Sequence, residues 1–336
     1  MTIKLAITGT GYIAKIHARA ALAQEDVELM AVVNHRPESM ATFASEFGIE
    51  RQYSSVTDLL GGSGVDALVI CTPNHLHAPQ TIEALRKGLH VLVEKPMSMN
   101  ASEAKAMVDA SQASGSLLMV AHNLRFDPEV IWMRDQLTAG RLGEIVRTKG
   151  YGVHVNWGPK GWFTKKELAG GGAMADMGIH AIDTARFILG NPQPLSVYAQ
   201  IGTYYQDYEV DDTGVVLVKW QDGAVSYIEC GWWQPHADGK LGATQVYGTS
   251  GFGQIFPAYL KLLKNNGADV EKVDPSFPAV RDPHEPQSMY DDQMAHFIAC
   301  IISNQMPKTS GVDGWINMKI LDAAYESART GRVIEL

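Results

Sequence analysis

The feature that most constrains the fold is a pair of glycines near the N-terminus, Gly9 and Gly11, which separate an apolar run at 3–7 from an alanine-rich run at 12–22. A strand, a glycine turn and a helix in this order are typical of a dinucleotide-binding βα unit, although two glycines also suit an ordinary βα turn. Gly9 permits the tight turn, Gly11 lets the backbone approach a pyrophosphate, and Ala14 stands where a third glycine is usual. The pattern therefore predicts a helix whose first N–H groups face the phosphates of a cofactor.

Length and composition indicate a globular chain of two domains. At 336 residues the chain exceeds what one compact core usually contains, and we place the boundary between 1–122 and 123–336. Apolar residues make up 46% and charged residues 19%, and the net charge of −9 argues against a nucleic-acid or anionic-membrane partner. We find no leader-like segment and no apolar run that could span a bilayer, and the 3 cysteines are widely spaced, as in a reduced protein. We therefore expect a cytoplasmic protein.

The first domain alternates strand-like and helix-like runs. Short apolar runs typical of buried strands lie at 3–7, 27–33, 66–71, 90–93 and 117–120, and runs typical of helices lie at 12–22, 38–47, 78–87 and 100–114. Strands that alternate with helices at this spacing predict a parallel, doubly wound sheet.

The second apolar run ends at Asn34-His35-Arg36, about 20 residues after the glycine turn, where a dinucleotide fold places the adenosine ribose. A carboxylate at this point would bind both ribose hydroxyls and repel a 2′-phosphate, but this chain has the neutral Asn34. Arg36 offers a guanidinium that suits a 2′-phosphate. We therefore favour NADP over NAD, while an asparagine that bonds the 2′-hydroxyl keeps NAD open.

Two further segments follow buried strands at the carboxyl edge of the predicted sheet, where ligands bind in open α/β folds. One is 72–77 and the other is Glu94-Lys95-Pro96. Lys95 is either a solvated loop lysine or an ammonium beside the nicotinamide, where it would polarise a reacting oxygen. The residues we expect to contact the cofactor are Gly9, Gly11, Tyr12, Ile13, Asn34, His35, Arg36, Thr72, Pro73, Asn74, His77, Glu94, Lys95, Pro96 and Asn123.

In the second domain, three glycines at 170–172 lead into a predicted helix that extends to about residue 189. Asp176 and His180 are four residues apart, so on a helix they share one face. A carboxylate beside an imidazole orients it and raises its basicity, as a general base requires; a zinc pair and a purely structural pair are the alternatives. Zinc needs a third protein ligand and no cysteine cluster supplies one, so we expect no metal.

From 195 to 254 the pattern changes to β-type runs with no helix between them, which predicts antiparallel pairing in one sheet. Such a sheet covers one face with helices and leaves the other face open. Apolar and aromatic residues on the open face would explain a homodimer or homotetramer. The proline-rich segment 274–286 reads as a loop, and helices at 287–303 and 311–330 end the chain.

These motifs together resemble the glucose–fructose oxidoreductase / inositol dehydrogenase family (Gfo/Idh/MocA), and the resemblance covers essentially the whole chain. The matching segments are 9–14, 71–77, Glu94-Lys95-Pro96 and 170–183. The resemblance implies an α/β fold, with an N-terminal Rossmann domain containing a doubly wound parallel sheet and a C-terminal α/β domain with a large, mostly antiparallel, open-faced sheet. It also implies that Lys95, Asp176 and His180 are catalytic and that the peptide bond before Pro96 is often cis.

The expected activity is that of an NAD(P)-dependent oxidoreductase acting on a secondary alcohol of a sugar, inositol or related polyol in a cleft between the domains. His180 would take the hydroxyl proton, Asp176 would orient His180 or grip a neighbouring hydroxyl, and Lys95 would bind the reacting oxygen. The candidates for substrate contacts are Lys95, Asn123, Arg125, His154, Trp162, Asp176, His180 and Asp183. Other aromatic residues, with sugar-pocket, core and interface roles open, are Trp157, Trp232, Trp233 and His236.

Two other classes of function remain open. One is a glycosidase of the same fold that uses tightly held NAD transiently and shows no net reduction of added cofactor. The other is a non-catalytic regulator that senses a sugar or a cofactor. The presence of Lys95, Asp176 and His180 argues against the regulator.

Overall fold

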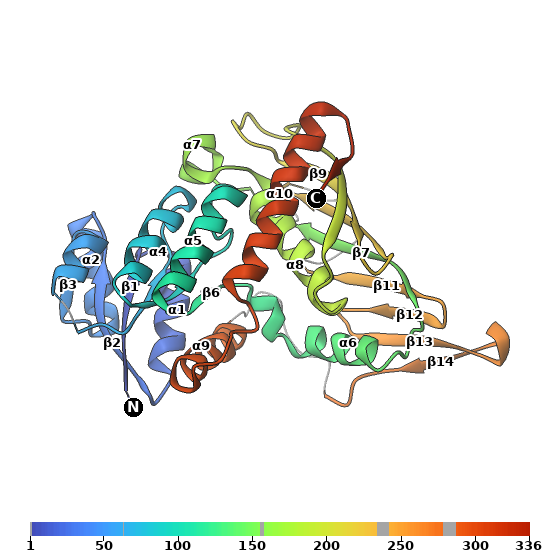
Figure 1. Cartoon of the computed structure of the whole chain (residues 1–336), viewed down its shortest axis with the longest axis horizontal. Helices are drawn as coiled ribbons and strands as arrows, with labels where there is room; N and C mark the ends of the chain where they lie inside the picture. The colour runs from blue at the N-terminus through green and yellow to red at the C-terminus, as the bar shows by residue number, and fades with distance from the viewer. Residues whose placement is uncertain (1, 63, 155–157, 234–241, 278–286) are drawn as a thin grey trace. The chain divides into compact units, whose positions relative to one another are not determined.

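The computed structural model describes residues 2–62, 64–154, 158–233, 242–277 and 287–336, and all structural statements refer to these (Figure 1). The chain divides into two compact units. The first consists of Met1–Asn123 with Glu285–Trp315, and the second of Leu124–His284 with Ile316–Leu336. Each unit is built on its own sheet, and each is treated separately below.

The sheet of the first unit has six parallel strands in the order β3-β2-β1-β4-β5-β6. The strands are β1 (Ile3–Thr8), β2 (Val27–Val33), β3 (Arg51–Tyr53), β4 (Ala67–Ile70), β5 (His90–Val93) and β6 (Leu118–Val120). The helices between them are α1 (Tyr12–Leu22), α2 (Pro37–Phe47), α3 (Val56–Gly62), α4 (His77–Arg86) and α5 (Ala101–Ser114). This is the predicted doubly wound Rossmann order, and it reverses between β1 and β4, where such folds bind ligands.

The sequence did not indicate β3 or α3. In the three residues of β3, Arg51 and Gln52 are exposed and only Tyr53 is half-buried. A strand this short and this exposed has no apolar run to reveal it, and it is recognisable only through its pairing with β2.

Helix α9 (Gln287–Ser303) belongs to the first unit, although the predicted boundary assigned all of 123–336 to the second domain. It packs on α1: the rings of Tyr290 and His17 meet edge to face at 5.1 Å, and the Gln287 side chain donates to the Ile16 carbonyl oxygen at 3.3 Å. The chain therefore returns to the first unit after completing most of the second.

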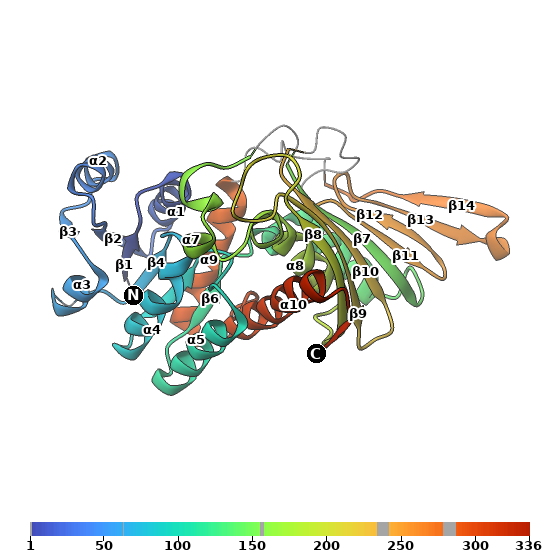
Figure 2. The ribbon, with the colours of Figure 1, turned by 90° about the horizontal axis from the view of Figure 1, so that it is seen from above.

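The sheet of the second unit has nine described strands in the order β14-β13-β12-β11-β7-β10-β9-β8-β15. They are β7 (Ile145–Val153), β8 (Pro194–Gly202), β9 (Thr213–Trp220), β10 (Val225–Gly231), β11 (Thr244–Gly248), β12 (Gly251–Gln254), β13 (Tyr259–Lys264), β14 (Asp269–Val273) and β15 (Ile334–Glu335). Helices α6 (Pro128–Thr138), α8 (Ile179–Ile188) and the part of α10 (Gly311–Thr330) that belongs to this unit lie along one face (Figure 2). The predicted mostly antiparallel, open-faced sheet is confirmed.

One pairing within this sheet differs from the prediction. The β-type runs between 195 and 254 were expected to pair antiparallel with one another, but β7 lies between β10 and β11 and runs parallel to β10. The reason is the route of the chain, which leaves β7, crosses the covered face as α8 and returns through β8 and β9. Strands β13 and β14, which extend the sheet beyond residue 254, were also not predicted.

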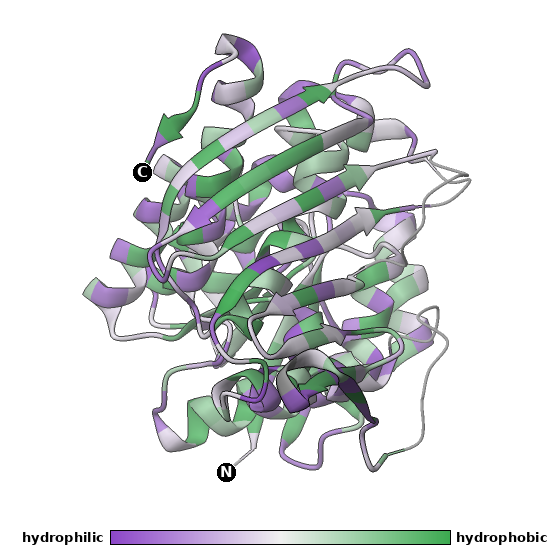
Figure 3. Ribbon diagram, turned by 90° about the vertical axis from the view of Figure 1, so that its right-hand side faces the viewer, coloured by the Kyte–Doolittle hydropathy of each residue, from purple (hydrophilic) through white to green (hydrophobic). Residues whose placement is uncertain are grey.

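The face of the second sheet opposite the helices carries aromatic and cationic side chains. Figure 3 shows hydrophobic and hydrophilic residues mixed along the strands of the ribbon. Along β9, residues alternate between buried and more exposed, with Leu217 39% exposed. The rings of Tyr247 and Phe252 lie 5.1 Å apart, and the Arg147 guanidinium lies 4.3 Å from the Tyr247 ring centre. We refer to the side chains of Arg147, Lys149, Leu217, Tyr227, Tyr247 and Phe252 as the open-face patch.

Several predicted features fall outside the described residues: Trp157, His236, and the prolines at 278, 283 and 286. In the described part of the predicted loop, 274–277 contains neither helix nor strand. Among the described helices, none combines the length and the apolarity that crossing a lipid bilayer requires.

Candidate active site

The glycine turn after β1 has the geometry that a pyrophosphate requires. Gly9 has a φ of +94°, and a Cβ at this position would lie 2.4 Å from the carbonyl oxygen of Cys71. Gly11 precedes α1 without a side-chain cap, and a Cβ there would meet no atom within 4 Å. Space is thus left above the first N–H groups of an 11-residue helix, which fits the phosphates of a dinucleotide.

At the end of β2, Asn34 is fixed between the glycine turn and the start of α2. Its amide donates to the Thr10 hydroxyl and its oxygen accepts from the Arg36 backbone N–H at 3.0 Å. The Thr10 hydroxyl is 2.7 Å from the Ser39 hydroxyl. His35 and Arg36 are exposed, so this end of the strand presents neutral and cationic groups.

His77 joins the loops that follow β4 and β5. Its Nε2 lies 2.7 Å from the Thr72 carbonyl oxygen, and its Nδ1 lies 2.8 Å from the Pro96 carbonyl oxygen. Burial lowers the pKa of His77, and its hydrogen bonds to the two carbonyl groups offset this only in part. Because the ring is 1% exposed, His77 holds two predicted cofactor segments together rather than presenting an open surface.

Lys95 follows β5 and its main chain is held by its neighbour. The buried Glu94 carboxylate accepts from His17 Nε2 at 2.8 Å through one oxygen and from the Lys95 backbone N–H at 3.0 Å through the other. Burial raises the pKa of Glu94, but the hydrogen bond from His17 and the charges of His17 and Lys95 outweigh it, so the pKa is lowered overall. The Lys95–Pro96 peptide bond is cis, and Lys95 itself is half-buried.

Asn123, three residues after the end of β6, has a buried side-chain oxygen. Its side chain is 7% exposed, and its Oδ1 accepts no hydrogen bond from the described residues. Buried polar atoms are nearly always satisfied, so this oxygen fits a ligand donor. Together with the glycine turn, it makes the first unit suited to a dinucleotide.

In the second unit, the glycine-rich run leads into a short π-helix, η4 (Met174–Gly178), and then into α8, rather than into the single α-helix predicted. The buried Asp211 carboxylate holds its start, accepting from the backbone N–H groups of Gly172 at 2.8 Å and Met174 at 2.7 Å. Burial raises the pKa of Asp211, and these bonds with that from Tyr325 offset it only in part. Isolated π turns inside helices often mark functional sites.

The π turn packs directly on the sheet. A Cβ on Gly152 of β7 would lie 2.2 Å from the Met177 carbonyl oxygen, and a Cβ on Gly178 would lie 3.0 Å from the Cβ of Cys230. The backbone of β7 at Gly152 therefore lies close to the backbone of the π turn at Met177. Small residues on both elements allow the segment that carries Asp176 and His180 to sit tightly on β7 and β10.

Asp176 is bound by a residue that the sequence pattern did not connect to it. The Trp232 indole Nε1 donates to Asp176 Oδ2 at 3.0 Å, and Trp232 is 0% exposed. His180, at the start of α8, is 8% exposed. Trp232 lies 56 positions further along the chain, so no local spacing could have revealed the contact.

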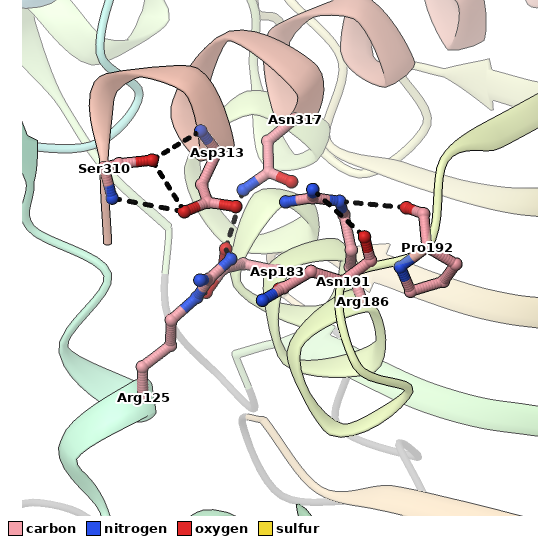
Figure 4. A network of polar contacts seen from close by, with 8 residues as sticks. All are labelled: Arg125, Asp183, Arg186, Asn191, Pro192, Ser310, Asp313 and Asn317. Carbon is pink, nitrogen blue, oxygen red and sulfur yellow. Dashed lines mark hydrogen bonds and ion pairs between the residues drawn. The ribbon is translucent and has the colours of Figure 1, made fainter. Parts of the chain in front are cut away.

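Arg125 and Asp183, which we predicted as candidates for substrate contacts, form an ion pair with each other inside the second unit (Figure 4). Arg125 Nε and Nη2 donate to the two Asp183 oxygens at 2.8 and 2.7 Å, and the Asn317 amide donates to Asp183 at 2.7 Å. The Arg125 side chain has 0% exposure, so its guanidinium is committed to holding η2 (Asn123–Phe126) against α8.

The remaining candidates lie after strands or in a short 3-10 helix, η3 (Gly161–Thr164), of the second unit. His154 follows β7, is half-buried, and donates its backbone N–H to the Gly231 carbonyl oxygen at 2.9 Å. Trp162 stacks on Phe163 at 3.9 Å, and Trp233 Nε1 donates to the Tyr208 hydroxyl at 3.1 Å. Roles for these residues in substrate binding stay predictions.

Comparisons with known proteins agree with this architecture. A family model described as "Oxidoreductase family, NAD-binding Rossmann fold" matches residues 3–122, and one described as "GFO/IDH/MocA C-terminal domain" matches 130–252. D-glucoside 3-dehydrogenase of Escherichia coli is 29% identical, with 99% of this chain and 97% of that protein covered. The rhizopine catabolism protein MocA of Rhizobium meliloti is 30% identical over 75% of this chain and 77% of its own length. The crystal structure of an aldose-aldose oxidoreductase from Caulobacter crescentus complexed with glycerol superposes with a TM-score of 0.85 at 26% identity, covering 100% of both chains.

Proposed function

Because this chain belongs to the Gfo/Idh/MocA family of NAD-binding oxidoreductases, we propose that it transfers a hydride between nicotinamide and a secondary alcohol or ketone of a sugar, an inositol or a related polyol. The observation that carries the proposal is the fixing of Lys95 at the end of β5 by the buried Glu94 carboxylate. A lysine anchored at the carboxyl edge of a parallel sheet is suited to act on a bound substrate. When bound, the nicotinamide supplies the hydride acceptor or donor.

Three side chains carry the proton chemistry in this proposal. His180 accepts the hydroxyl proton of the alcohol as a general base, and returns it in the reverse direction. Asp176 orients His180 or grips a neighbouring hydroxyl, and Lys95 donates a hydrogen bond to the reacting oxygen as it gains carbonyl character. The positive charge of the Lys95 ammonium stabilises the negative charge that develops on that oxygen as its proton leaves.

NADP is the favoured cofactor in this proposal. Asn34 supplies no carboxylate to repel a 2′-phosphate. The exposed Arg36 lies two residues further along, and the part-buried Ser39, whose hydroxyl pairs with that of Thr10, follows three residues later. A guanidinium and a hydroxyl at the start of α2 suit three phosphate oxygens. In this proposal the glycine turn at Gly9 and Gly11 binds the pyrophosphate, and the Asn123 side chain binds the nicotinamide end of the cofactor.

Binding and turnover test the proposal separately. NADPH and NADH affinities are measured by fluorescence, and turnover by cofactor absorbance with a panel of inositols, aldoses and glycosides. Lys95→Ala and His180→Ala should keep cofactor affinity and lower kcat by roughly 10²–10⁴-fold. Lys87→Ala, at an exposed lysine after α4, is the matched control and should behave as wild type. Near-normal rates in both variants would contradict the proposal, and cofactor binding without turnover on the whole panel would favour a regulator.

The proposal extends to assembly through the open-face patch. Leu217 and the aromatic rings of Tyr247 and Phe252 offer apolar surface, and the Arg147 guanidinium over the Tyr247 ring adds a directional contact. A homodimer or homotetramer would cover this surface with a second copy of the same patch.

A further inference from the structure

The hydrogen bond between Trp232 and Asp176 is the most informative contact that the proposed reaction does not yet use. It joins a buried indole N–H to one carboxylate oxygen at 3.0 Å. An indole N–H only donates, carries no charge and does not titrate in the physiological range. It can therefore hold a carboxylate in one orientation without supplying a proton or neutralising the negative charge.

Packing fixes the Trp232 ring in one place. Its side chain has 0% exposure and lies in a core cluster with Ala173, Met177 and Val210. The Tyr208 ring meets it edge to face at 5.8 Å. A donor locked by its neighbours keeps its direction when substrate or solvent changes around it.

The main chain holds donor and acceptor in register. The Asp211 carbonyl oxygen accepts from the Ala173 backbone N–H at 2.8 Å, three residues before Asp176, and the Asp212 carbonyl oxygen accepts from the Trp232 backbone N–H at 2.8 Å. Two consecutive residues that precede β9 thus anchor both the π turn and the tryptophan. The relative position of the indole and the carboxylate follows from this shared anchor.

We propose that Trp232 is a positioning residue for Asp176, which rests on the proposed function in assigning Asp176 to the reaction. The indole N–H binds one oxygen of the carboxylate and fixes its orientation. The carboxylate thereby keeps the direction that its proposed role with His180 requires. Trp232 touches neither the substrate nor the cofactor in this scheme.

A matched pair of substitutions tests the proposal. Trp232→Phe removes the indole N–H and keeps an aromatic ring. Trp220→Phe is the control, because Trp220 is also 0% exposed and its Nε1 also donates a hydrogen bond. The acceptor is the Ser226 hydroxyl at 2.7 Å, so this bond does not involve Asp176. Both variants should lose stability, but only Trp232→Phe should lower kcat selectively, by roughly 10- to 100-fold, as removal of a group that supports a functional side chain does. Equal kcat losses in the two variants would overturn the proposal.

A double-mutant cycle separates positioning from general loosening. If Trp232 acts through Asp176, the double variant Trp232→Phe with Asp176→Asn should have a kcat close to that of Asp176→Asn alone. In the double variant Trp220→Phe with Asp176→Asn, the fold-losses in kcat of the two single variants should multiply. Fold-losses that also multiply for Trp232→Phe with Asp176→Asn would contradict the inference.

A readout independent of activity keeps this inference distinct from the proposed function. In protein labelled with ¹⁵N-tryptophan, the Trp232 indole signal is the one missing from Trp232→Phe. Asp176→Ala should move that signal markedly and leave the Trp220 signal in place. An unmoved Trp232 signal would overturn the pairing even if turnover is normal, whereas a moved signal in a protein without turnover would support the pairing and reject the proposed reaction.

Discussion

His17 Nε2 lies 2.8 Å from Glu94 Oε1, with 0% and 7% of the two side chains exposed. His17 comes from α1, the helix whose start faces the predicted phosphates, and Glu94 binds the backbone N–H of Lys95. One buried pair thus connects the cofactor helix to the candidate catalytic lysine within the first unit.

The first prediction concerns the stability of this pair against acid. The pKa of Glu94 is lowered in the folded protein, so its carboxylate stabilises the fold above its ordinary pKa and loses that contribution as pH falls through the lowered value. Glu94→Gln should therefore be less stable than wild type at pH 7, with a gap that narrows between about pH 5 and pH 3. The free energy of unfolding, measured by urea titration at several pH values, checks this.

Glu46→Gln provides the control for that series. Glu46 pairs with Lys15 on the surface at 2.5 Å, with about a third of each side chain exposed, and such pairs contribute little to stability. The free energy of unfolding of Glu46→Gln should change with pH in the same way as that of wild type. If Glu94→Gln also showed the wild-type pH dependence, the buried pair would not favour the ionised carboxylate.

The second prediction separates the two glycines of the turn. Gly9→Ala places a Cβ 2.4 Å from the Cys71 carbonyl oxygen at a φ of +94°, so it should lower the free energy of unfolding by several kcal/mol, about 1–3 of them from backbone strain. Gly11→Ala meets no protein atom and should fold normally, but its methyl group should weaken NADPH and NADH binding. Thermal unfolding and fluorescence titration of both variants check this, and a destabilised Gly11→Ala with intact affinity would contradict it.

Much of the first unit was predictable because its signals are local. Short apolar runs alternate with helices that end at glycines such as Gly48 and Gly115, and both of these have the left-handed backbone that favours glycine. The cofactor segments follow the strands directly, so knowing the strands also locates them. β3 was not predicted because its residues form no apolar run, and only its pairing with β2 identifies it as a strand.

Features of the second unit were harder to predict, because they depend on contacts between residues far apart in the sequence. The parallel pairing of β7 with β10 and the bond from Trp232 to Asp176 join positions whose spacing carries no period. The ion pair between Arg125 and Asp183 likewise joins residues far apart in the sequence, so their spacing did not indicate that the two charges are buried together. The sequence shows which side chains are capable of chemistry, but only the packed structure shows which of them form hydrogen bonds or ion pairs within the protein.

The third prediction concerns cofactor choice. Arg36→Ala should weaken NADPH binding by roughly tenfold and leave NADH binding nearly unchanged, because only NADPH carries the 2′-phosphate. Asn34→Asp should shift the preference toward NADH, since a carboxylate binds both ribose hydroxyls and repels the phosphate. Fluorescence titrations with both cofactors check this, and equal losses for the two cofactors in Arg36→Ala would count against an NADP preference.

The fourth prediction tests whether Arg125 stabilises the fold through its ion pair with Asp183. Arg125→Met leaves the Asp183 carboxylate buried without its guanidinium, which should cost about 3–5 kcal/mol in the free energy of unfolding. Adding Asp183→Asn removes the stranded charge and should restore part of the loss. Urea unfolding of the single and double variants checks this, and a variant with wild-type stability but a raised KM would return Arg125 to the substrate contacts.

The fifth prediction concerns assembly through the open-face patch. Tyr247 lies in the middle of the patch, between the Phe252 ring at 5.1 Å and the Arg147 guanidinium at 4.3 Å from its ring centre. Tyr247→Glu would place a carboxylate in any self-complementary contact of this face, and removing that charge from water is costly even beside Arg147. The variant should therefore shift the protein toward a smaller species while the circular dichroism spectrum stays unchanged. Tyr204→Glu is the control, because Tyr204 is 78% exposed in the loop after β8 and outside the patch. Sedimentation over a range of concentrations checks both variants, and a wild-type protein that remains monomeric throughout would show that the patch does not serve self-association.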